Sequence, residues 1–198
     1  MGKGRLEIFS DGVLAIIITI MVLEMKTPGD AELSALRPLA PVFVSYVLSF
    51  LYLGIYWGNH HHLLSVVQRV TSGIMWANLH LLFWLSLVPF VTRWMGEYRF
   101  ARAPTMLYGV ILWLAGFAYL ILQRAILREE GAGSRLAAAV GRDWKGKISL
   151  LIFGIAILLA LFRPWIAAAL YGFGVLWWLV PDRRIERILT APAVSGER

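Results

Sequence analysis

The sequence predicts an all-α membrane protein with six membrane-spanning helices. Hydrophobic residues make up 59% of its 198 residues and charged residues only 16%, whereas soluble domains are about 45–50% apolar and about 25% charged. The mean hydropathy is +0.69. A soluble core of this size could not bury so much apolar surface. A soluble globular enzyme is therefore excluded, and so is a disordered chain, because 13% of the residues are aromatic.

Six apolar segments are suited to crossing a hydrocarbon core, which takes about 20 residues per helix. Proline and glycine residues or charges separate them, as at Pro28, Pro164 and Pro181. We expect one domain over residues 1–190 and a mobile tail over residues 191–198. The last two segments are short and joined by a tight turn, so a re-entrant hairpin is an alternative for them. The predicted spans cover residues 9–25, 41–64, 74–94, 105–127, 148–162 and 165–180.

The distribution of basic residues predicts the orientation. Six spans place both termini on one side, with 13 of the 19 lysines and arginines on that side and 6 on the other. Basic loops remain in the cytoplasm, so both termini should be cytoplasmic. The net charge of +7 is then interpreted as topogenic charge that also contacts anionic membrane lipids. No nucleic-acid partner is predicted.

Several kinds of site are excluded by residue content. The chain has no cysteine, so it holds no disulfide, thiolate metal site or cysteine nucleophile. It also lacks a phosphate-binding loop, a nucleophile elbow and an HExxH motif. The sequence therefore predicts neither an enzyme nor a cofactor.

Polar residues gather at the cytoplasmic ends of the first two spans. Arg5 and Asp11 lie about 240° apart around a helix, at about 100° per residue, so they cannot pair within it. Because ionisable residues in a span are costly, each should find a partner on another helix. The predicted network comprises Arg5, Ser10, Asp11, Trp57, Asn59, His60 and His61, with His62 as an alternative histidine and His80 as a further candidate.

Three interpretations of this network remain open from the pattern alone. The network can tie helices together by satisfying buried polar atoms. Asp11 and a histidine can instead form a proton relay. Metal binding is disfavoured because consecutive histidines diverge by about 100°, so at most two of the three face one point. No fixed metal is predicted.

The first span also carries an apolar stripe. Thr19 is the only polar side chain between Asp11 and Glu24. The stripe runs through Gly12, Ile16, Thr19 or Ile20, and Leu23. The pattern by itself predicts packing against lipid or other helices.

The segment Arg5-x-x-x-Phe9-Ser10-Asp11 resembles the signature of one family. This is the prokaryotic branch of the endolysosomal potassium channels called transmembrane protein 175. The resemblance covers the first three spans, and the last three match in length and hydropathy only. Further similar segments are Tyr56-Trp57-x-x-His60-His61, Asn78-x-x-Leu81 and Pro89-Phe90-x-Thr92.

The resemblance implies a homotetramer around a central pore lined by the first helix of each subunit. It implies a potassium-permeable, modestly selective leak-type cation channel in a prokaryotic inner membrane. The constriction would be formed by apolar side chains, and potassium would be the permeant ion. The polar network would position the first helix. By distance from the motif, the constriction residues are Ile16, Thr19 or Ile20, and Leu23.

Glu24 follows this stripe near the outer end of the span. It could concentrate cations at the pore mouth, or be an interfacial charge beside Lys26. Two rival functions also remain. One is a proton-coupled transporter or proton leak pathway that uses Asp11 and a histidine, and the other is a non-conducting membrane scaffold.

Overall fold

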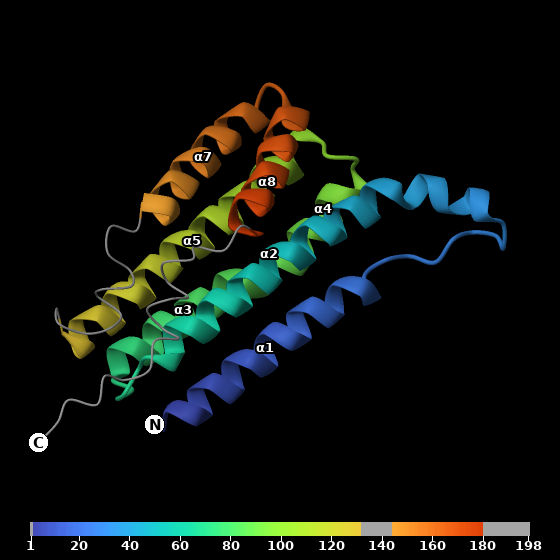
Figure 1. Ribbon diagram of the computed structural model, residues 1–198. Helices are drawn as coiled ribbons and strands as arrows, with labels where there is room; N and C mark the ends of the chain where they lie inside the picture. The colour runs from blue at the N-terminus through green and yellow to red at the C-terminus, as the bar shows by residue number, and fades with distance from the viewer. Residues whose placement is uncertain (1, 132–143, 180–198) are drawn as a thin grey trace, which may run out of the picture.

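The computed structural model describes residues 2–131 and 144–179, and every regular secondary-structure element in this part of the chain is a helix, as predicted. A short 3-10 helix, η1 (Leu33–Leu39), precedes the second long helix. The helices are α1 (Lys3–Leu23), α2 (Ala40–Ser65), α3 (Ser72–Ser86), α4 (Val88–Glu97), α5 (Arg102–Glu130), α7 (Trp144–Ala160) and α8 (Pro164–Leu179) (Figure 1).

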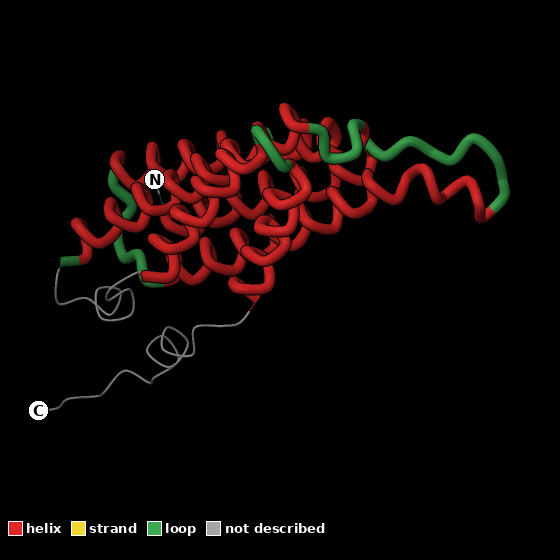
Figure 2. The backbone as a smooth tube through the Cα atoms, turned by 90° about the horizontal axis from the view of Figure 1, so that it is seen from above, coloured by secondary structure: helices red, strands yellow, loops and turns green. Residues whose placement is uncertain are grey.

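The helices pack side by side along a common direction, with α1 at one edge of the bundle (Figure 1). Helices α2, α3 and α5 form the middle, and the pair α7 and α8 covers the side away from α1. The connection from α1 to η1 extends beyond the end of the bundle, as Figure 2 shows. Among the described residues, one long face of α1 has no neighbour and is exposed.

Four helical segments of the described chain are long and apolar enough to cross a membrane: Lys3–Leu23, Leu33–Ser65, Ser72–Glu97 and Arg102–Glu130. They correspond to the first four predicted spans. The fifth and sixth correspond to α7 and α8, which have only 17 and 16 residues. That each of these two crosses separately stays a prediction. The predicted mobile tail, residues 191–198, lies outside the described residues.

The third predicted span, 74–94, consists of two helices, α3 and α4, which meet at Leu87. Pro89 lacks the amide hydrogen that would donate to the carbonyl of Leu85 in a continuous helix. The amide of Leu87 instead donates to the carbonyl of Trp84, three residues earlier, over 3.3 Å. This break allows α4 to take its own direction toward α1 and α2.

Helix α8 is fixed to the middle of the bundle by tyrosines. The hydroxyl of Tyr171 donates to the backbone carbonyl of Thr105 over 3.2 Å. It lies against Gly109, where a Cβ atom would come within 2.0 Å of the hydroxyl oxygen. Tyr52 of α2 donates in turn to the backbone carbonyl of Tyr171. These contacts hold α8 against both α2 and α5.

Candidate functional site

Helix α1 has one buried face that repeats at intervals of three and four residues. This is the spacing of a single helix face. Because Ser10 is the only polar residue on that face, it marks the place where α1 can be held by a hydrogen bond rather than by packing alone. The buried residues are Leu6, Ser10, Leu14, Ile17 and Met21.

The opposite face of α1 carries the predicted constriction residues. Ile16 is 58% exposed, Ile20 is 40% exposed and Leu23 is 80% exposed in the single subunit. Thr19 is exposed as well, so burial in one subunit does not distinguish it from Ile20. The Thr19 hydroxyl donates within its own helix, to the carbonyl of Ala15 or Ile16, each 3.0 Å away. An apolar face is therefore presented outward along α1.

A buried chain of hydrogen bonds joins α1 to α3 and α2. The side-chain nitrogen Nδ2 of Asn78 donates to the Ser10 hydroxyl over 2.9 Å. The Ser10 hydroxyl in turn donates to the backbone carbonyl of Leu6 over 2.8 Å. Asn78 Oδ1 lies 2.6 Å from Nε2 of His60. His60 is only 2% exposed, and Ser10 and Asn78 are fully buried. Each polar atom in this chain is satisfied by the next one, which fixes the three helices relative to one another.

A second polar contact ties α1 to α2 at the rim of the bundle. The indole nitrogen of Trp57 donates to the carboxylate of Asp11 over 3.0 Å. Both side chains are exposed, so this contact depends less on burial than the Ser10 chain does. Asp11 and Trp57 thus meet as the sequence analysis anticipated.

Four other candidates lie apart from these contacts. Arg5 is exposed and forms no ion pair with any residue in the described part of the chain. His61 and His62 are exposed, and their rings pack against each other. His80 accepts a hydrogen bond from Trp84 on its own helix, 2.9 Å away.

The side chain of Asn59 lies apart from the network as well. It borders a cavity between α2, α5, α7 and α8. Neighbouring residues on α2 project about 100° apart, and for this reason only His60 of its run of polar residues reaches the buried chain.

Asn78 is the residue that the network prediction left out. It stands in the sequence only as part of a motif in the third span, and nothing in its spacing assigns it to Ser10. The usable signal was that an asparagine inside an apolar span needs a hydrogen-bond partner.

A cluster of charges joins the C-terminal ends of α1 and α4. Arg93 donates to the carboxylate of Glu24 and also to that of Glu97, over 3.3 Å for the second. Lys26 pairs with Glu97 at 3.1 Å. Glu24 is therefore paired with Arg93, and Lys26 with Glu97, rather than with each other. These side chains are exposed or partly exposed, so the ion pairs contribute little to the net stability of the protein. They do hold the end of α1 next to α4.

A groove runs along α1 beside α4, with Ile16, Ile20 and Phe90 in its wall, and the charged residues Glu24, Arg93 and Glu97 line it as well. Within residues 2–131 and 144–179, no three histidine or acidic side chains gather to hold a metal ion. The arrangement thus consists of one exposed apolar face of α1, with the buried Ser10–Asn78 hydrogen bond on the opposite face and the Glu24–Arg93 ion pair at the C-terminal end of the helix.

Residues 5–89 match the sequence profile of the family described as endosomal/lysosomal potassium channel TMEM175. A potassium channel of Chryseobacterium sp. (strain P1-3) is 50% identical to this chain over 189 residues, which covers 96% of this chain and 98% of that protein. The endosomal/lysosomal proton channel TMEM175 of Rattus norvegicus is 26% identical over 230 residues, covering 92% of this chain but only 46% of that protein.

The fold also matches a solved structure. The crystal structure of a lysosomal potassium-selective channel TMEM175 homolog from Chamaesiphon minutus superposes with a TM-score of 0.75 and 26% sequence identity. The match covers 92% of this chain and 97% of that one. By its extended identity to the Chryseobacterium protein and its match to the family profile, the chain belongs to the TMEM175 family, in its prokaryotic branch.

Proposed function

We propose that this protein is a potassium-permeable, modestly selective leak-type cation channel. It works as a homotetramer in which α1 of each subunit lines a central pore. The observation that carries the proposal is the open apolar face of α1, with Ile16, Ile20 and Leu23 exposed and with the buried hydrogen bond of Ser10 on the opposite face. A relative with 50% identity that is named a potassium channel supports the same function.

The chemistry of such a pore follows from the helix that lines it. A membrane helix uses its carbonyl groups in its own hydrogen bonds, so they cannot replace the hydration shell of an ion. Rings of Ile16, Ile20 and Leu23 side chains would instead narrow the path and control it by dewetting. Removing water costs less for potassium than for the smaller sodium ion, which gives a modest preference. The channel needs no cofactor, is not an enzyme, and has potassium as its permeant ion.

The proposal includes the assembly and its place in the cell. Six spans per subunit would put both termini in the cytoplasm, and the prokaryotic inner membrane would be its location. Membrane lipids would contact the outer helices, where Leu151 and Leu158 of α7 are each 63% exposed. The exposed stripe of α1 would instead face the other subunits and the pore.

Flux measurements on purified protein in proteoliposomes test this function. We expect fast, non-saturating potassium efflux that exceeds sodium efflux under the same gradient. Vesicles without protein provide the background. Efflux that saturates, or that requires a proton gradient, would contradict the proposal.

A proton pathway is the second candidate, because the related protein of Rattus norvegicus is named a proton channel. Asp11 at the rim and the buried His60 would be its titratable groups. In that case a pH-sensitive dye inside the vesicles would report proton flux, and Asp11→Asn would abolish it without loss of assembly. A non-conducting scaffold would show no flux of any ion.

The charge of Arg93 should influence cation entry if Glu24 lies at the pore mouth. Arg93→Gln removes the cation that neutralises Glu24, so the local potential becomes more negative. We expect higher potassium flux at low ionic strength, and an effect that fades near 1 M salt because the Debye length falls to about 3 Å. Flux in proteoliposomes at two ionic strengths measures this.

Glu24→Gln is the matched variant, and it should lower potassium flux under the same low-salt conditions. If both variants give wild-type flux at every ionic strength, Glu24 is an interfacial charge and not part of the mouth.

A further inference from the structure

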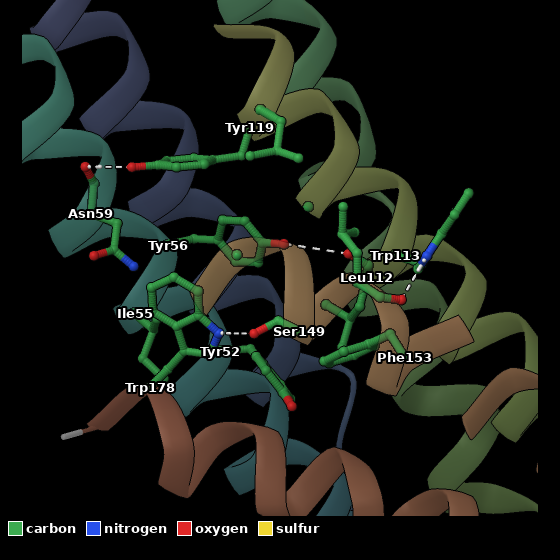
Figure 3. A pocket seen from close by; sticks show the side chains of 14 residues that line it. Tyr52, Ile55, Tyr56, Asn59, Leu112, Trp113, Tyr119, Ser149, Phe153 and Trp178 are labelled. Atoms are coloured by element: carbon green, nitrogen blue, oxygen red, sulfur yellow. Dashed lines mark hydrogen bonds between the residues drawn. The ribbon is translucent and has the colours of Figure 1, made fainter. Parts of the chain in front are cut away.

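The cavity inside the bundle is small. It lies among aromatic rings of α2, α5, α7 and α8 and has a volume of about 70 Å³, which suits a few water molecules. Four of the rings have their polar ends hydrogen-bonded within the protein, as the dashed lines in Figure 3 show. Side chains that lack partners among the described residues lie instead on the surface, at the end of the bundle where α1 and α4 end and α2 begins.

The segment that joins α1 to α2 projects beyond this end of the bundle (Figures 1 and 2). Together η1 and α2 form a helical segment of 33 residues, Leu33–Ser65. At about 2.0 Å per residue in η1 and about 1.5 Å per residue in α2, this segment is about 53 Å long. A bilayer with its headgroups is about 40–45 Å thick. With Ser65 at one membrane surface, η1 therefore emerges into water at the other.

The emerging segment exposes both apolar and acidic side chains. Leu33 is 83% exposed and Leu36 is 51% exposed, and lipid cannot cover apolar side chains that lie outside the bilayer. Asp30 and Glu32 precede them, are exposed, and form no ion pair with any described residue. The Asp30 carboxylate accepts a hydrogen bond from the backbone amide of Glu32 over 2.8 Å. These four residues are called the projecting surface below.

The turn between α4 and α5 carries complementary charges at the same end of the bundle. Arg99 and Arg102 are exposed and form no ion pair with residues in the described ranges. They lie beside the N-terminus of α5, which has no acidic residue in its first turn, so their charge adds to the positive end of the helix dipole. Tyr98, which is 61% exposed, offers an aromatic ring beside them. Tyr98, Arg99 and Arg102 are called the turn surface.

The backbone of this turn is held firmly. Arg99 and Phe100 have φ angles of 48° and 58°, which residues other than glycine seldom adopt. The amide of Phe100 donates to the carbonyl of Met95 over 2.9 Å, and the Phe100 ring packs against the core. The amide of Arg99 donates to the carbonyl of Gly96 over 3.1 Å. The turn surface is thus presented on a fixed backbone, which lowers the entropy cost of binding a partner.

We propose that the projecting surface of one subunit binds the turn surface of a neighbouring copy of this chain. The carboxylates of the first would pair with the guanidinium groups of the second, and Leu33 would pack on Tyr98. A lipid headgroup could satisfy the arginines but would leave the leucines in water. The two surfaces differ and form no ion pair with each other within the described subunit, so each copy would use one toward each of its neighbours.

Contacts of this head-to-tail kind close a ring when the rotation between copies allows it. The inference rests on the homotetramer of the proposed function. It adds that the subunits are joined outside the membrane, around the end of the pore that α1 would line.

Disulfide cross-linking in proteoliposomes tests the proposal, because the chain has no cysteine of its own. The protein carries Glu32→Cys and Arg102→Cys together and is oxidised with copper phenanthroline. Since each copy would link to two neighbours, we expect a ladder of bands up to the tetramer on a non-reducing gel. Each single variant should give no band above the dimer.

Glu32→Cys with Arg163→Cys is the matched control. Arg163 is also exposed, but it lies between α7 and α8, which cover the side of the bundle away from α1 (Figure 1). This pair should give no ladder above the dimer.

Charge reversal in the Glu32→Cys/Arg102→Cys protein tests the pairing itself. Asp30→Arg should slow the formation of linked bands about fivefold, near the upper limit for one exposed ion pair. Adding Arg99→Asp should restore the rate, because the two charges are then exchanged. Equal rates in the presence and absence of Arg99→Asp would overturn the charge pairing.

Native mass spectrometry of each variant separates this inference from the proposed assembly. A tetramer that gives no ladder, or that links only within single chains, would overturn the inference and leave the tetramer intact. Monomers in the mass spectrum of the wild type would overturn both.

Discussion

Ile16→Asn is expected to raise potassium conductance about tenfold and to reduce the preference for potassium over sodium. An amide in each of four subunits would allow water to remain in a constriction that Ile16 keeps dry. A barrier lower by about 1.4 kcal/mol is enough for a tenfold increase in rate. Single-channel recording in planar bilayers measures the conductance, and the reversal potential under mixed potassium and sodium gradients measures selectivity.

The matched control for this variant is Ile155→Asn on α7, a helix that lies on the side of the bundle away from α1 (Figure 1). This isoleucine is 46% exposed. The control variant introduces the same polar group without touching the proposed pore, so conductance and selectivity should stay at the wild-type values. Unchanged currents in Ile16→Asn, from a well-folded tetramer, would remove Ile16 from the constriction.

Asn78→Ala is expected to destabilise the protein by about 3 kcal/mol, because it leaves the buried groups of His60 and Ser10 without their partner. Helix α1 would also lose its hydrogen-bonded connection to α3. We therefore expect a lower unfolding temperature and a smaller yield of assembled protein. Thermal unfolding followed by tryptophan fluorescence, together with size-exclusion chromatography, measures both.

Asn59→Ala is a suitable control for this stability measurement. It makes the same change near the same membrane end, but its carboxamide has no hydrogen bond with the described residues. Its unfolding temperature should remain close to that of wild type. A similar loss in the two variants would show that the Ser10–Asn78–His60 chain has no special role.

The sequence predicted the bounds of α2 closely, as residues 41–64 against Ala40–Ser65 in the structure. The helix α1 (Lys3–Leu23) begins before the predicted span of residues 9–25, because its first turns are polar and hydropathy does not mark them as helix. The sequence also brought Ser10 and His60 into one network, since polar groups at the same membrane depth must find partners. Of the neighbouring polar residues on α2, only His60 points toward Asn78, because side chains one residue apart on a helix point about 100° apart. The pattern could not show which of them faces α3.

Other features depend on distances between helices, which cannot be derived from the hydrophobic periodicity of the sequence. The sequence does not show that Arg93 reaches Glu24, which lies on a different helix. The break at Leu87 was missed because the apolar character of the third span continues through Pro89. The aromatic cavity has no sequence signature, since its rings come from four separate helices.

Cysteine scanning of α1 tests the central claim most directly, because the chain contains no cysteine of its own. Single substitutions at Ile16, Ile20 and Leu23 would each be treated with a positively charged, membrane-impermeant thiosulfonate reagent in proteoliposomes. Leu14→Cys and Ile17→Cys, on the buried face of the same helix, serve as controls.

We predict that the reagent lowers potassium flux at least about tenfold at the three exposed positions, since a bulky cation in a narrow path both blocks it and repels potassium. Flux through the two control variants should not change. Block at Leu14 or Ile17 would contradict the assignment of the pore face. Full modification of Ile16→Cys, Ile20→Cys and Leu23→Cys without loss of flux would show that α1 does not line the ion pathway.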